Sequence, residues 1–142
     1  MAGQRVIYSY KGLTPPAGLL SLISHGEAAG VVFFSDNISS RAQIRAVIQT
    51  LEHADASPQN PVQAPLLLMT DQEGGKIRRL PGAPLLSEKQ IGTSADPAVE
   101  ASKAGTAAGR NLHGLGLNVN LAPVVGTARR APSTTSTAAP TA

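Results

Sequence analysis

The sequence of 142 residues contains no cysteine, and aromatic residues make up only 3% of it. Without cysteine, disulfide scaffolds, catalytic thiolates and cysteine-ligated zinc sites are excluded, and the redox compartment cannot be inferred. Two tyrosines and two phenylalanines leave few rings to stack on nucleobases, and the net charge is only +3. We therefore expect no nucleic-acid partner.

Long apolar runs are also missing. No stretch approaches the roughly 20 residues that span a bilayer, so we expect no membrane partner. Met1–Arg5 has no apolar stretch typical of a signal peptide, which predicts a cytoplasmic location for the chain as written. No Asp or Glu lies at metal-ligand spacing from His25, His53 or His113, so we expect no metal and no other cofactor.

Strand-like and helix-like segments alternate along the chain. The content of 42% hydrophobic residues, with 14 glycines and 11 prolines, is typical of a globular protein with many tight connections. Strands are expected over 5–10, 30–34, 64–70 and 117–122. Helices are expected over 13–24, from Ser39 or Ser40 to about His53, and over 96–113.

Three local signals refine this pattern. Thr14 and Asp96 each precede proline and can cap a helix that begins there. The unbroken apolar run Gly30–Phe34 predicts a strand buried on both faces, as in a parallel sheet. The fold class is therefore α/β, either an open doubly wound sheet or part of a (β/α)₈ barrel, and periodicity leaves both open.

The connection over 71–95 is long, polar and rich in Gly and Pro, which is typical of a functional loop. It opens with Asp71-Gln-Glu-Gly-Gly75 directly after a buried strand, where parallel α/β folds bind ligands. A carboxylate at Asp71 and guanidinium groups at Arg78 and Arg79 suit a polyhydroxylated ligand. The alternative is that Asp71 caps a turn and Glu73 pairs with a surface arginine.

Three segments in order carry a resemblance to a known family. Asp71-Gln-Glu-Gly-Gly-Lys-Ile-Arg-Arg-Leu80 resembles the loop after the third strand of glycoside hydrolase family 3, especially its β-N-acetylhexosaminidase branch. Gly30-Val-Val-Phe-Phe-Ser-Asp-Asn37 and Gly116-Leu-Asn-Val-Asn-Leu-Ala-Pro-Val-Val125 are similar to its second and fourth strands. The resemblance covers about residues 3–125 and implies the first half of a (β/α)₈ TIM-type barrel.

The resemblance also implies roles for single residues. Asp71 and Arg79 would bind a carbohydrate substrate, while Glu73, Gly74 and Gly75 would shape the loop. The activity implied for an intact family member is retaining hydrolysis of terminal β-linked N-acetylhexosamine or glucose. No catalytic residue can be assigned, because the family's nucleophile and acid/base lie on later strands. The alternative is a catalytically silent sugar-binding or non-functional half barrel.

The last residues depart from the family pattern. We expect residues 1–125 to be a partial barrel domain and residues 126–142 to be a disordered tail, because the tail has no large apolar residue to offset its ordering entropy. Codons for 132–142 can be chosen so that another frame encodes the Gly-Arg-Ser-Tyr-like segment of the family. A frameshift is our hypothesis, and resequencing around codon 126 tests it.

Half a barrel would leave exposed surfaces. Four strands without their partners have two open edges and one uncovered apolar face. We therefore expect poor solubility or self-association through the sheet edges. The stretch Gly105–Arg110 superficially suggests a phosphate loop, but it lies in a helix pattern, and close packing at a helical glycine is the preferred interpretation.

Overall fold

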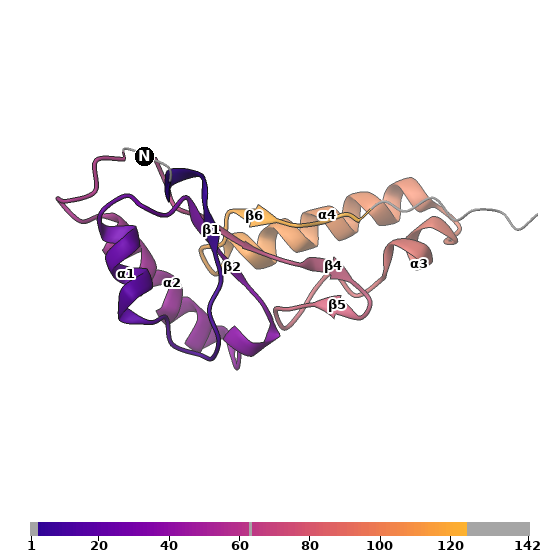
Figure 1. The fold of residues 1–142 in the computed structure, drawn as a ribbon. Helices are drawn as coiled ribbons and strands as arrows, with labels where there is room; N and C mark the ends of the chain where they lie inside the picture. The colour runs from indigo at the N-terminus through magenta and orange to yellow at the C-terminus, as the bar shows by residue number, and fades with distance from the viewer. Residues whose placement is uncertain (1–2, 63, 125–142) are drawn as a thin grey trace, which may run out of the picture.

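Four parallel strands form the central sheet of the computed structural model, which describes residues 3–62 and 64–124. Their spatial order follows the chain without a reversal (Figure 1): β1 (Ile7–Tyr8), β2 (Gly30–Phe33), β3 (Leu67–Thr70) and β6 (Val119–Asn120). This confirms the predicted parallel α/β fold. The strands are shorter than expected.

Three longer helices connect these strands: α1 (Ala17–Ser24), α2 (Arg41–Asp55) and α4 (Pro97–His113). Short 3₁₀ turns lie at Gly3–Arg5 (η1) and Ser35–Asn37 (η2). The long connection after β3 has structure of its own, namely the hairpin β4 (Gln72–Gly74) and β5 (Ile77–Arg78) and the short helix α3 (Glu88–Gly92).

Two helices begin where the sequence predicts. The Ser40 side chain accepts a hydrogen bond from Gln43 N at 3.1 Å at the start of α2. The Asp96 side chain accepts one from Val99 N at 3.1 Å at the start of α4, where Pro97 is the first helical residue. Each bond satisfies a backbone N–H that has no partner inside the helix.

The predicted start of the first helix is wrong. Helix α1 begins at Ala17 instead of Leu13, and its N-cap is Pro16, which makes no side-chain cap bond. Thr14 is therefore not the cap. The cause is local, since a residue that precedes proline avoids the helical region, and both Thr14 and Pro15 precede one.

All three longer helices cover the same face of the sheet. One buried cluster joins Leu19 of α1, Ile44 of α2 and Leu112 of α4 to Val31 and Leu68 of the strands. A doubly wound sheet places helices on both faces and reverses its strand order, whereas a barrel does neither. The fold is therefore that of half a (β/α)₈ barrel.

The opposite face of the sheet is less covered than expected. Continuous apolar strands predicted burial on both faces, but Ile7 and Leu67 are 37% and 40% exposed. The register places both beside Gly30 in one row across the sheet. Within β2 itself the prediction holds for Gly30, Val31 and Phe33, which are buried, and Val32 is half-buried. The strands on either side of β2 are more open because no helix among the described residues packs on that side.

The glycines of α4 do not pack closely against other elements. An added Cβ at Gly105 or Gly109 would meet nothing within 4 Å among the described residues, so the expected close packing at helical glycines is wrong.

Residues 126–142 lie outside the described part, as does the proposed domain boundary after residue 125. No described helix is long and apolar enough to cross a bilayer.

Candidate functional site

Side chains from two neighbouring strand ends meet at the carboxyl edge of the sheet. Asp71 follows β3, and its Oδ2 lies 3.3 Å from Nε of Arg79. Arg79 Nη1 also donates to Oγ of Ser35, which follows β2, at 3.2 Å. We call Ser35, Asp71 and Arg79 the strand-tip site. The Asp71 and Arg79 side chains are 20% and 27% exposed, so both remain accessible to a ligand.

The hairpin β4–β5 brings Arg79 back to Asp71. Gln72 pairs with Arg78 in antiparallel register, and Arg79 N donates to the Asp71 carbonyl at 3.1 Å. Gly74 and Gly75 form the bend with φ of +114° and +56°. Both values lie in the left-handed region that glycine adopts without strain.

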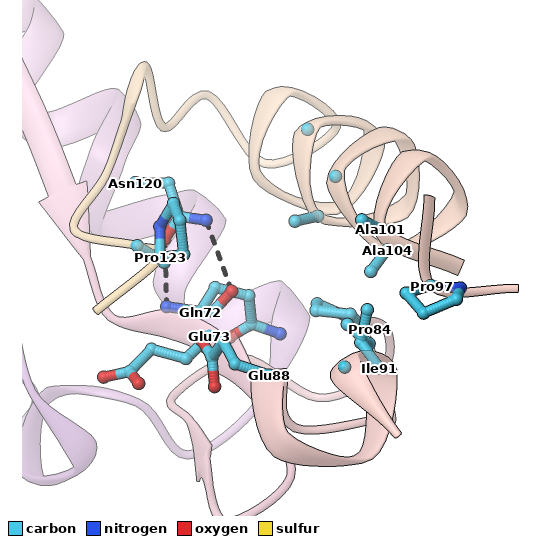
Figure 2. Close-up of a pocket in the computed structure, with 15 residues that line it drawn as sticks. Gln72, Glu73, Pro84, Glu88, Ile91, Pro97, Ala101, Ala104, Asn120 and Pro123 are labelled. Atoms are coloured by element: carbon cyan, nitrogen blue, oxygen red, sulfur yellow. Dashed lines mark hydrogen bonds between the residues drawn. The ribbon is translucent and has the colours of Figure 1, made fainter. Parts of the chain in front are cut away.

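The buried side chain of Gln72 holds the 71–95 loop in place through hydrogen bonds to its backbone. Its buried side-chain amide donates to the carbonyls of Leu80 (3.2 Å) and Ala83 (3.0 Å), and its Oε1 accepts from Leu80 N (3.0 Å). Figure 2 shows its backbone bonded in both directions to the Asn120 side chain, at 3.0 and 3.2 Å. These contacts fix the backbone directly after Asp71.

A second buried amide joins the ends of the first two strands. Asn37 is fully buried, and its Nδ2 donates to the carbonyls of Tyr10 and Gly12, each at 2.9 Å. Its Oδ1 accepts from Phe34 N at 2.8 Å. The sequence pattern assigned no supporting role to Gln72, Asn37 or Asn120, although a polar residue inside or next to an apolar strand was an available signal.

A cavity lies near the strand-tip site, among the described residues. Its volume is about 580 Å³, and it opens between β4, β6, α3 and α4 (Figure 2). The walls are mainly the small or apolar residues Pro84, Ile91, Ala101, Ala104 and Ala108, whereas neither Asp71 nor Arg79 lines it. Sugars need several hydrogen-bonding groups, so the strand-tip site is the better candidate for a carbohydrate.

Glu73 lines this cavity and has a perturbed carboxyl group. Partial desolvation, followed by the like charges of Glu88 and Asp71, raises the pKa of Glu73 above its ordinary value of 4.5, and Arg79 opposes the shift. No described arginine or lysine forms an ion pair with Glu73. The alternative in which Glu73 pairs with a surface arginine is therefore wrong, and Asp71 holds the arginine instead.

We expect the Glu73→Gln variant to be more stable than the native chain at pH 7. A carboxyl group whose pKa is raised on folding destabilises the folded state when it is ionised, and the penalty vanishes below its unfolded pKa. The gain in melting temperature should therefore be present at pH 7 and absent near pH 4. Thermal unfolding at both pH values measures it.

The Glu88→Gln background provides the control. The charge of Glu88 is one cause of the raised pKa of Glu73. Without that charge, the gain in melting temperature from Glu73→Gln at pH 7 should be smaller. A gain of equal size at pH 4 and pH 7 would contradict the assignment.

The strand-tip site offers an acceptor and a set of donors side by side. The Asp71 carboxylate can accept from two adjacent hydroxyls, and the planar Arg79 guanidinium can donate to ring or hydroxyl oxygens. No cluster of His, Cys, Asp and Glu suited to a metal occurs within residues 3–62 and 64–124. An acceptor beside several donors matches the hydroxyl groups of a polyol.

Comparisons with known sequences agree on one family. A model of the glycosyl hydrolase family 3 N terminal domain matches residues 13–138. An uncharacterized secreted glycosyl hydrolase of Arthroderma benhamiae is 43% identical, over 87% of this chain and 35% of its own length. Beta-hexosaminidase A of Pseudoalteromonas piscicida is 33% identical, over 79% and 19% respectively. The chain thus spans about a third or less of these relatives.

Solved structures agree on the fold. A glycoside hydrolase family 3 β-N-acetylglucosaminidase from Paenibacillus sp. superposes with a TM-score of 0.75 at 31% identity, over 86% of this chain and 23% of that chain. A β-N-acetylhexosaminidase from Beutenbergia cavernae gives 0.70 at 28% identity, over 86% and 36%.

Proposed function

Because this chain belongs to glycosyl hydrolase family 3, we propose that its strand-tip site binds a terminal β-linked N-acetylhexosamine, with glucose as the alternative sugar. The observation that carries the proposal is the Asp71 carboxylate, held 3.3 Å from Arg79 at the carboxyl end of β3 and still partly exposed. An ion pair leaves carboxylate lone pairs free for hydroxyl donors. The names of the β-hexosaminidase relatives support N-acetylhexosamine over glucose.

For the protein as a whole we infer retaining hydrolysis of the glycosidic bond. That reaction needs two carboxyl groups about 5 Å apart on either side of the bond. Asp71 is engaged by Arg79, and Glu73 lines the cavity between β4, β6, α3 and α4. Neither is assigned as nucleophile or acid/base, and the role inferred for Asp71 and Arg79 is substrate binding. Glu73, Gly74 and Gly75 shape the loop in the same proposal.

The second candidate is a sugar-binding chain without catalysis. The same observation favours it. Among the described residues, Asp71 and Arg79 form a pair that can bind a sugar, but no two carboxyl groups are assigned to the two sides of a glycosidic bond. The two candidates share the strand-tip site and differ only in turnover.

Two measurements on the same chain, one of binding and one of turnover, test the candidates. We expect N-acetylglucosamine to shift the backbone NMR signals of Ser35, Asp71 and Arg79 in the isotope-labelled 142-residue chain, saturably and in the millimolar range. With a chromogenic N-acetyl-β-glucosaminide we expect no release of chromophore above buffer.

Each outcome has a separate meaning. Absence of saturable shifts at these three residues overturns the sugar-binding proposal. Turnover that survives purification to constant specific activity overturns the non-catalytic candidate. N-acetylgalactosamine, which differs from N-acetylglucosamine in the orientation of one hydroxyl, serves as the control ligand and should bind more weakly.

A further inference from the structure

Another cavity adjoins the strand-tip site and shares Arg79 with it. Its volume is about 290 Å³, and its walls are Ile38 and Ser39 on one side and residues 78–82 on the other. We call it the arginine cavity. Because Arg79 is a member of both, a ligand at the strand-tip site lies next to this cavity.

The walls of the arginine cavity follow the two central strands of the described sheet. Ile38 and Ser39 come after β2, and residues 78–82 belong to the loop after β3. The strand order is β1-β2-β3-β6, so both of these strands have their two sheet neighbours among the described residues. The cavity therefore does not arise from an open edge of the sheet.

Hydrogen bonds hold both walls in place. On one side, Ser39 N donates to Oε1 of Gln43 at 3.1 Å. On the other, the Pro81 carbonyl accepts from Nδ2 of Asn111 at 3.2 Å and from Nη1 of Arg41 at 3.3 Å. Walls that are ordered before a ligand arrives lower the entropic cost of binding it.

The charge of Arg78 has no carboxylate partner within residues 3–62 and 64–124. Its Nε donates to the Gly75 carbonyl at 3.0 Å and its Nη1 to the Gly82 carbonyl at 2.8 Å. Both acceptors are neutral, and neither described ion pair includes Arg78. No Asp or Glu lines the arginine cavity. A guanidinium group has five N–H donors, so three remain for a ligand.

A fixed guanidinium group with free donors suits an oxyanion. Arginine binds carboxylates and phosphates through parallel N–H···O bonds, and such charge-assisted bonds are stronger than those to a neutral hydroxyl. The cavity is also small, since ligand pockets usually have volumes of about 300–1,000 Å³. It therefore suits an anionic group attached to a sugar better than a second complete ligand.

We propose that the ligand of the strand-tip site carries an anionic group, either a carboxylate or a phosphate or sulfate ester, and that Arg78 binds this group in the arginine cavity. The proposal rests on sugar binding at the strand-tip site and narrows the substrate class to acidic saccharides. The anionic group is either a substituent of the terminal sugar or part of what is linked to its anomeric carbon.

The affinities of plain and phosphorylated N-acetylglucosamine test the proposal. NMR titration of the labelled 142-residue chain gives dissociation constants for N-acetylglucosamine, its 6-phosphate and its β-1-phosphate. We expect at least one phosphate to bind about 10-fold more tightly than the plain sugar and to shift the signals of Arg78 and Gly82. Preference for the 6-phosphate indicates a substituent of the terminal sugar, and preference for the β-1-phosphate indicates a group at the anomeric carbon.

Two variants change the cavity in different ways. Arg78→Gln removes the positive charge, whereas Ser39→Asp places a negative charge on the opposite wall and leaves the hydrogen bonds of Arg78 intact. Both should lower the ratio of the affinities for the favoured phosphate and the plain sugar from about 10 to about 1. The matched controls are Arg110→Gln and Ser102→Asp, at exposed positions of α4 that do not line the cavity. Both should keep the ratio.

The outcomes separate this proposal from sugar binding itself. Saturable binding of all three sugars with equal affinity overturns the anionic group and leaves sugar binding standing. A ratio that Ser39→Asp does not lower, or that the α4 controls lower equally, assigns the preference to the net charge of the chain and also overturns the proposal. If none of the three sugars binds saturably, the sugar-binding proposal fails and this one fails with it.

Discussion

Replacing Asp71 with asparagine should weaken binding of N-acetylglucosamine by about 10- to 100-fold. The substitution keeps the shape of the side chain but removes its charge, and a hydrogen bond to a charged group contributes about 1.5–3 kcal/mol. It also releases Arg79, which Asp71 holds at 3.3 Å. The guanidinium then loses the partner that orients it toward the ligand. Titration of the labelled chain, followed by NMR, measures the change in affinity.

Glu100→Gln is the matched control for this experiment. It breaks the other ion pair of the described residues, Lys103–Glu100 at 2.7 Å, which lies on the surface of α4. Sugar affinity should be unchanged in that variant. If Asp71→Asn and Glu100→Gln bind the sugar equally well, Asp71 is not part of the binding site.

Replacing Gly74 with alanine should destabilise the fold by about 3 kcal/mol. A Cβ at this position would lie 2.0 Å from the Leu86 carbonyl oxygen, and φ of +114° is a conformation that L-residues rarely adopt. Backbone strain and overpacking each cost about 1–3 kcal/mol. For a chain of this length the melting temperature should fall by roughly 10 °C. Thermal unfolding at one fixed protein concentration measures it.

Gly109→Ala is the corresponding control. Gly109 lies inside α4, and an added Cβ there meets nothing within 4 Å among the described residues. Alanine favours the helix over glycine by about 1 kcal/mol, so this variant should be slightly more stable than the native chain. A Gly74→Ala variant that unfolds at the native temperature would show that the 71–95 loop can relax around the new methyl group.

Asp71 and Gly74 have different roles in the site, so their substitutions should have different effects. Asp71 would contact the sugar directly, so its loss should leave the fold intact. Gly74 shapes the bend that returns the chain to Arg79, so its substitution should reduce both stability and affinity. Measuring unfolding and binding on both variants separates the roles.

Much of the fold could be predicted from the sequence because the relevant signals are local. The caps at Ser40 and Asp96 are three residues from the N–H groups that they bind. The apolar spacing in α2 depends only on the period of the helix. The start of α1 was missed for an equally local reason, the effect of proline on the residue before it.

The strand-tip site was only half predictable. Asp71 and Arg79 are eight positions apart in one loop, and their meeting follows from the glycine bend between them. Ser35 reaches Arg79 across 44 positions, and Asn120 binds Gln72 across 48. Such contacts follow from which strands are neighbours, and spacing along the chain does not determine that.

The sequence by itself determined the four strands of the sheet, the three longer helices and the position of the acidic loop, since each depends on residues within a few turns of one another. It did not predict the hairpin β4–β5 or the helix α3 inside that loop. Periodicity left a barrel and a doubly wound sheet open, because helices with the same apolar stripe can pack on either face. The family resemblance favoured the barrel, and the tertiary structure decided for it. It also decided which face of the sheet stays open. That choice comes from the summed packing of α1, α2 and α4 against the strands, and no single segment encodes it.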